Sequence, residues 1–169
     1  MIRIVGAVLV LAGAGGIGVG KGLQFYRQLR QLRDFVGAVE ILKCELNYSL
    51  LPLPKLYRVV GRRTQGACGR FFNTLANHLE QGMPRNRAVE HALSDTHGLC
   101  LPKDALLSLL ELCSTLGRYD MEGENRMLQL SGQRMKAALE RTEREKRPLA
   151  KSYASLGFCT GIALVILML

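Results

Sequence analysis

Hydrophobic and polar positions divide the chain into three parts. Uncharged, apolar runs cover residues 4–20 and 152–169, and a polar, charged segment lies between them. Each run is about as long as the roughly 17–25 residues with which an α-helix crosses a bilayer core. The pattern therefore predicts transmembrane helices in residues 1–22 and 152–169, with a domain of residues 23–151 between them.

Apolar residues in the middle segment recur at three- and four-residue steps, which is the spacing of amphipathic helices. The first helix should continue from the N-terminal run to about Leu51, because prolines follow it. Further helices are expected to begin near Pro54, Phe72, Pro84, Pro102 and Asp120. The one that begins at Pro54 should end in the glycine-rich stretch "GRRTQGACG" (61–69). Asp120 can cap the last helix, after a stop at Gly117.

The same spacing predicts which residues face the core. They are Leu29, Leu32, Val36, Val39, Leu42, Leu46, Phe72, Leu75, Ala76, Leu79, Ala88, Val89, Ala92, Leu93, Leu106, Leu109, Leu110, Cys113, Leu116, Met127, Leu128, Met135, Ala138, Leu139 and Thr142. No segment alternates apolar and polar residues as a strand does. The fold class is therefore all-α, a bundle of about six helices whose first and last members continue into the transmembrane segments.

Charge predicts the topology. The net charge is +9, and twenty-two of the twenty-three basic residues lie between the two apolar runs. Basic residues follow the first run from Lys21 to Arg33 and precede the second from Arg141 to Lys151. The positive-inside rule then places residues 23–151 in the cytoplasm and both termini on the opposite side of the membrane.

The stretch "VLVLAGAGGIGVGKG" (8–22) matches the spelling of two nucleotide-binding motifs. A dinucleotide fold needs strands on either side and an acidic residue after the second one, and a P-loop needs Ser or Thr where Gly22 stands. Neither requirement is met. In lipid, small residues at four-residue spacing let helices pack closely, so Gly16 and Gly20, with Gly157 and Gly161, are the candidates for transmembrane packing.

The remaining motifs favour a protein without catalytic chemistry. The five cysteines form no C-x-x-C pair, and the three histidines form no H-E-x-x-H pattern. In a cytoplasmic domain such cysteines are most simply small apolar residues. We expect no enzyme activity, no catalytic residue, no cofactor, no metal and no small-molecule substrate.

Basic residues point to two kinds of partner. Those near the membrane entries suit anionic lipid. Arg62, Arg63 and Arg70 lie farther along the chain and are candidates for contact with an acidic protein. No aromatic-interleaved platform supports nucleic-acid binding.

Three stretches together resemble a known family. "ELNYSLLPLPKL" (45–56), "LGRYDMEGE" (116–124) and "YASLGFCTGIALVILML" (153–169) are similar to the stage III sporulation protein AB family of endospore-forming bacteria. The resemblance covers essentially the whole chain. The stretch "FFNTLANHLEQGMPRNRAVEHAL" (71–93) also resembles, more distantly, the cytoplasmic helical domain of type II secretion and type IV pilus platform proteins.

These resemblances imply a membrane-anchored adaptor in the mother-cell membrane around the forespore. It would belong to the channel complex between the two compartments and be required for spore development. The implied partners are the cytoplasmic ATPase of that complex, other membrane components of the channel and the bilayer, with Arg118 and Tyr119 as further contact candidates. Two other hypotheses stay open: a membrane-tethered nucleotide-binding protein that uses Lys21, and a basic module that binds lipid or nucleic acid.

Overall fold

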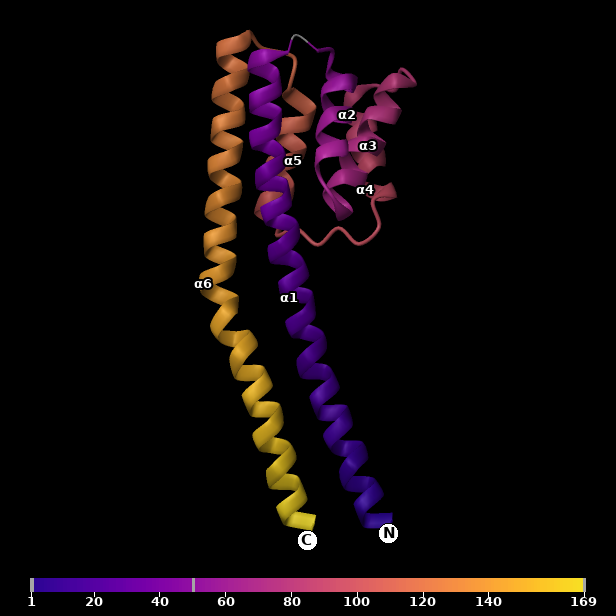
Figure 1. The fold of residues 1–169 in the computed structure, drawn as a ribbon, viewed down its shortest axis with the longest axis vertical. Coiled ribbons are helices and arrows are strands. Elements are labelled where there is room, and N and C mark those ends of the chain that lie inside the picture. The colour runs from indigo at the N-terminus through magenta and orange to yellow at the C-terminus, as the bar shows by residue number, and fades with distance from the viewer. Residues whose placement is uncertain (1, 50, 169) are drawn as a thin grey trace. The chain divides into compact units, whose positions relative to one another are not determined.

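The computed structural model describes the backbone of residues 2–49 and 51–168, and the side chains of residues 24–49 and 51–145. Every regular element in these ranges is a helix (Figure 1). In chain order they are α1 (Ile2–Tyr48), α2 (Leu53–Arg63), α3 (Gly66–Glu80), α4 (Arg85–Asp95), α5 (Lys103–Thr115) and α6 (Met121–Met168). The predicted all-α class with about six helices is confirmed.

The helices belong to two compact units. One comprises the terminal stretches Met1–Leu29 and Arg141–Leu169, and the other, here the central unit, is Arg30–Glu140. Among the residues described with their side chains, no helix combines the length and the apolar character that crossing a membrane requires. The predicted transmembrane segments, residues 1–22 and 152–169, lie outside those residues.

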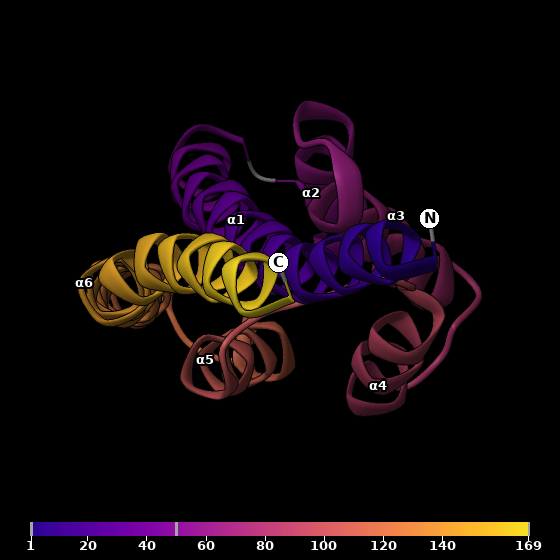
Figure 2. The same ribbon diagram turned by 90° about the horizontal axis from the view of Figure 1, so that it is seen from below.

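Within the central unit, α6 runs antiparallel to α1. Asn47 and Asn125 exchange two side-chain hydrogen bonds of 2.9 and 2.8 Å near one end of the pair. Farther along, Lys136 Nζ lies 2.6 Å from Glu40 Oε1. Helices α2 to α5 gather beside this part of α1, as the two views in Figures 1 and 2 show.

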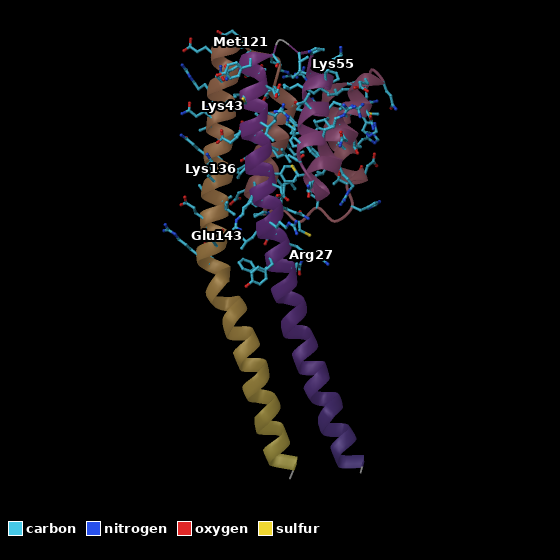
Figure 3. The ribbon with its side chains drawn as sticks, viewed as in Figure 1. Arg27, Lys43, Lys55, Met121, Lys136 and Glu143 are labelled. Atoms are coloured by element: carbon cyan, nitrogen blue, oxygen red, sulfur yellow. The ribbon has the colours of Figure 1, made fainter. Side chains whose placement is uncertain are left out.

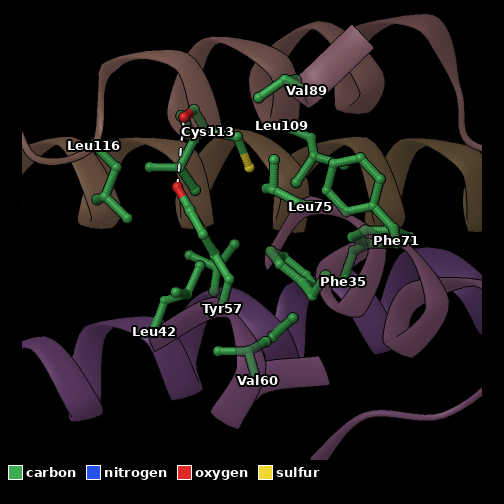
Figure 4. Packing of buried hydrophobic residues seen from close by; sticks show 14 of the residues in the cluster. Phe35, Leu42, Tyr57, Val60, Phe71, Leu75, Val89, Leu109, Cys113 and Leu116 are labelled. Atoms are coloured by element: carbon green, nitrogen blue, oxygen red, sulfur yellow. Dashed lines mark hydrogen bonds between the residues drawn. The ribbon is translucent and has the colours of Figure 1, made fainter. Parts of the chain in front are cut away.

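One apolar core receives side chains from all six helices (Figure 4). Aromatic rings occupy its middle: the ring centroids of Phe35 and Phe71 lie 6.0 Å apart, and those of Phe71 and Phe72 lie 5.2 Å apart. The ring of Tyr57 stacks on Phe72, and its hydroxyl donates to the carbonyl of Cys113 at 3.4 Å. The core thereby joins α1, α2, α3 and α5.

The helical periodicity identified most of the core correctly. Of the predicted positions, Leu32, Leu75 and Leu109 are fully buried, whereas Val36 and Leu93 are only partly covered. The periodicity missed some of the most buried residues. These are Phe35, Ala38, Leu56, Tyr57, Val60, Phe71 and Leu112.

The stretch "GRRTQGACG" (61–69) ends the helix before it, as predicted, since α2 stops at Arg63. Its glycines lie in α2 and α3, and the break between the helices is confined to Thr64 and Gln65. A Cβ on Gly61 would lie 2.5 Å from Asn73 Oδ1 and 2.9 Å from the Asn73 backbone nitrogen. Gly61 is therefore a close-packing position between α2 and α3, and Asn73 Nδ2 donates to its carbonyl at 3.1 Å.

The helix expected to begin near Phe72 begins earlier, at Gly66, and the other predicted helix boundaries hold to within a few residues. Pro84 and Pro102 directly precede α4 and α5, where the missing proline N–H costs nothing. Gly117 ends α5 with a φ of +86°, a conformation that is costly for residues with a Cβ. A Cβ there would also lie 2.5 Å from Leu53 Cδ1.

Two glycine substitutions should change the stability of the chain in opposite directions. We expect Gly117→Ala to lower the free energy of unfolding by about 1–3 kcal/mol, because of its positive φ and the contact with Leu53. Gly37→Ala should raise it by up to about 1 kcal/mol, because Gly37 lies exposed in α1 and a Cβ there meets nothing within 4 Å. Chemical denaturation of the full chain measures both free energies of unfolding. Equal changes in the two variants would contradict the conclusion that position 117 requires glycine.

Candidate partner-binding surface

The loop between α5 and α6 is held by a buried carboxylate. Glu124 is 4% exposed, and its Oε1 accepts hydrogen bonds from the backbone N–H groups of Gly117 and of Tyr119, the latter at 3.2 Å. These are backbone groups that no helix satisfies, since they lie between α5 and α6. Glu124 therefore fixes the path of the chain from Gly117 to Tyr119.

The first turn of α6 is packed against the same loop. Asp120 Oδ1 accepts a hydrogen bond from the N–H of Gly123 at 3.1 Å, which confirms the predicted helix cap. A Cβ on Gly123 would lie 2.8 Å from that oxygen and 2.9 Å from Tyr119 Cβ. Gly123 thus allows the loop to lie directly on the helix.

Two side chains of this loop take no part in holding it. Tyr119 is 57% exposed, and Arg118 is exposed as well. Neither side chain has a hydrogen-bond or ion-pair partner among the residues described with side chains. In the stretch "LGRYDMEGE" (116–124), Glu124, Asp120 and Gly123 therefore hold the loop, whereas Arg118 and Tyr119 extend from it into solvent.

The other three candidate arginines also differ in whether their side chains have a partner. Arg63 forms an ion pair with Glu45 at 2.7 Å, and Arg70 Nη2 donates to the carbonyl of His97 at 3.1 Å. Arg62 is exposed, and no described side chain or carbonyl pairs with it. The structure does not bring the three together with Arg118 and Tyr119 into one cluster of contacts.

Many acidic side chains of the central unit have basic partners. Glu80 pairs with Arg58, Glu111 with Arg134, and Glu122 with Arg126. Lys136 (labelled in Figure 3) pairs with Glu40, and its hydrogen bond lowers the pKa of the Glu40 carboxyl. Exposed charge without a partner is consequently mostly positive.

The buried thiols and His78 of the central unit are packed among other side chains. Burial raises the pKa of the Cys68 and Cys113 thiols to about 12, so neither is a thiolate at neutral pH. His78 Nε2 lies 3.1 Å from Asp95 Oδ2 and close to His91. No group of three His, Cys, Asp or Glu side chains with metal-binding geometry occurs in the described ranges.

The four glycines predicted to pack transmembrane helices are not among the side chains that the structure describes. Gly16, Gly20, Gly157 and Gly161 lie outside the residues whose side chains the structure describes. Lys21 and the whole of the glycine-rich stretch 8–22 lie outside them too. Helix packing by these residues stays a prediction.

Comparison with known proteins gives consistent matches. The family model described as "Stage III sporulation protein AB" matches residues 3–169. The stage III sporulation protein AB of Bacillus subtilis (strain 168) is 24% identical over 173 residues, covering 100% of both chains. A solved structure of a stage III sporulation protein AB has a TM-score of 0.64 at 22% identity, over 72% of this chain and 98% of the other, and shows the same fold.

Glu124 gives a test of how the loop is held. We expect Glu124→Ala to lower the free energy of unfolding by about 1–3 kcal/mol, because two backbone donors lose their acceptor. Glu124→Gln keeps an acceptor oxygen for the two N–H groups and should cost less than Glu124→Ala. Denaturation of the full chain at neutral pH measures both. Equal losses in the two variants would mean that charge, rather than the hydrogen bonds, holds the loop.

Proposed function

Because the chain belongs to the stage III sporulation protein AB family, we propose that it is the membrane-anchored adaptor of a sporulation channel complex and docks the cytoplasmic ATPase of that complex. Residues 1–22 and 152–169 anchor it in the mother-cell membrane around the forespore. The domain between them faces the mother-cell cytoplasm, and other membrane components of the channel contact the anchors. The chain acts through binding and carries out no reaction of its own.

The observation that supports this proposal is that some candidate arginines are paired within the central unit and others are not. Arg63 and Arg70 are engaged inside the central unit, whereas Arg62, on α2, and Arg118, in the α5–α6 loop, are exposed and have no described partner. An exposed guanidinium offers five donors suited to bidentate contact with a carboxylate. Such side chains favour an acidic protein surface as the partner.

Binding to the purified ATPase tests this proposal. The full chain in nanodiscs of neutral lipid should bind, and the double variant Arg62→Glu/Arg118→Glu should bind at least about tenfold more weakly, since like charges now meet. Arg126→Glu/Arg134→Glu is the matched control: it makes the same charge change at exposed arginines that already have partners. Its affinity should change less than about twofold.

Three results would contradict the proposal. If the wild-type chain does not bind the ATPase at low salt, the proposed adaptor function is wrong. Nucleotide binding abolished by Lys21→Ala would favour the tethered nucleotide-binding protein. Salt-sensitive binding to anionic vesicles or nucleic acid, without ATPase binding, would favour the basic module.

Thiol labelling tests the proposed topology. Cys44 is exposed, whereas Cys68 and Cys113 are buried and their pKa is raised, so Cys44 reports the location of the central unit. In a Cys100→Ser/Cys159→Ser background in a bacterial plasma membrane, an impermeant maleimide should label Cys44 only after permeabilisation. An added Ile2→Cys substitution should be labelled in intact cells. Labelling of Cys44 before permeabilisation would show the opposite orientation.

A further inference from the structure

Exposed apolar side chains gather at one end of the central unit. Tyr48 (87% exposed) ends α1 and Met121 begins α6, whereas Leu51 and Tyr119 (57% exposed) lie in the α1–α2 and α5–α6 connections. We call these four residues the tip. The reciprocal hydrogen bonds between Asn47 and Asn125 hold the two connections next to each other.

The tip lies at the end of the central unit where α1 ends and α6 begins. Tyr48 lies eighteen positions after Arg30 in α1, which is about 27 Å of helix. The chain leaves the unit at Arg30 and Glu140, so the tip lies at the other end of both helices.

Other exposed apolar side chains in the described part of the unit stand singly. Leu107 is 54% exposed on α5, and Leu130 is 46% exposed on α6. Isolated residues of this kind are common on soluble surfaces and need no partner. The tip differs because it combines two tyrosines with two aliphatic side chains.

Hydrogen bonds hold the backbone that carries Tyr119. Glu124 and Asp120 fix the backbone beneath Tyr119, and Gly123 lets Tyr119 lie against α6. A loop whose backbone is already ordered loses less entropy on association. Tyrosine is also among the residues that contribute most to binding at the centre of protein interfaces.

Charge around the tip is complementary to acidic groups. Lys55, in the first turn of α2 at the same end of the unit (Figure 3), and Arg118 are exposed and have no described partner. The neighbouring acids are engaged: Asp120 caps α6, Glu122 pairs with Arg126, and Glu124 is buried. A partner segment that fits here carries both apolar and acidic side chains.

We propose that the ATPase docks on the tip. The segment of the ATPase that binds there carries both apolar and acidic side chains. This inference rests on the proposed function and adds the docking face and the chemistry of the bound segment. Tyr48 and Tyr119 supply the apolar contact, and Lys55 and Arg118 orient the segment by charge.

Binding of the full chain in neutral-lipid nanodiscs to the purified ATPase tests the tip. Tyr48→Ser/Tyr119→Ser should weaken binding at least about tenfold, as expected for residues at the centre of an interface. Leu107→Ser/Leu130→Ser is the matched control and should change the affinity less than about twofold. Unfolding midpoints equal to wild type show that both variants are folded. Higher salt should weaken binding of the wild-type chain, because Lys55 and Arg118 contribute by charge.

The outcomes separate the two proposals. If the wild-type chain binds the ATPase and the tip variant binds equally well, the docking face is wrong and the proposed function stands. If the wild-type chain does not bind, both fail. If the tip variant loses self-association or binding to anionic vesicles while its ATPase affinity is unchanged, the tip serves a second copy or lipid, and the inference is overturned.

Discussion

The central unit depends on the packing of one aromatic cluster. Phe35 of α1 lies 6.0 Å, between ring centroids, from both Phe71 and Phe72 of α3, and Phe72 stacks on Tyr57 of α2. Burial of each such ring contributes about 1.5–3 kcal/mol, and edge or offset pairing adds about 0.5–1.5 kcal/mol. Phe71 and Phe72 are adjacent and both buried, which requires α3 to be covered on two sides. A helix in that position is the centre around which the others pack.

This packing also sets the positions of the loops. The ring of Tyr57 crosses the core so that its hydroxyl reaches the carbonyl of Cys113 on α5, which relates α2 to α5. With α2 and α5 placed, Leu53 lies against Gly117, and the loop that follows can return its N–H groups to Glu124. A contact surface made of Arg118 and Tyr119 therefore depends on a core to which neither residue belongs.

Sequence periodicity predicted the helices because each buries one apolar stripe, and that stripe is visible without a partner. It could not predict how closely two helices approach, so it did not identify Gly61 as the position where α2 packs against Asn73. Phe35 was missed because it lies beside the stripe and is buried by α3 rather than by its own helix neighbours. Glu124 was missed for a related reason: an acidic residue near a helix start is usually solvated, and its burial follows only from the return of the Gly117 loop.

The arginines show why a candidate binding surface has to be identified from both the sequence and the structure. In the sequence, Arg62 and Arg63 are adjacent basic residues that cannot be distinguished by composition or spacing. In the structure, one is exposed and the other forms an ion pair with Glu45, whose position is known only once α1 and α2 are packed. An arginine that is already paired gains less from a new carboxylate, because the existing pair must first be broken. The charge offered to a partner is thus the part that folding leaves unpaired, and in the central unit that part includes Arg62, Lys55 and Arg118.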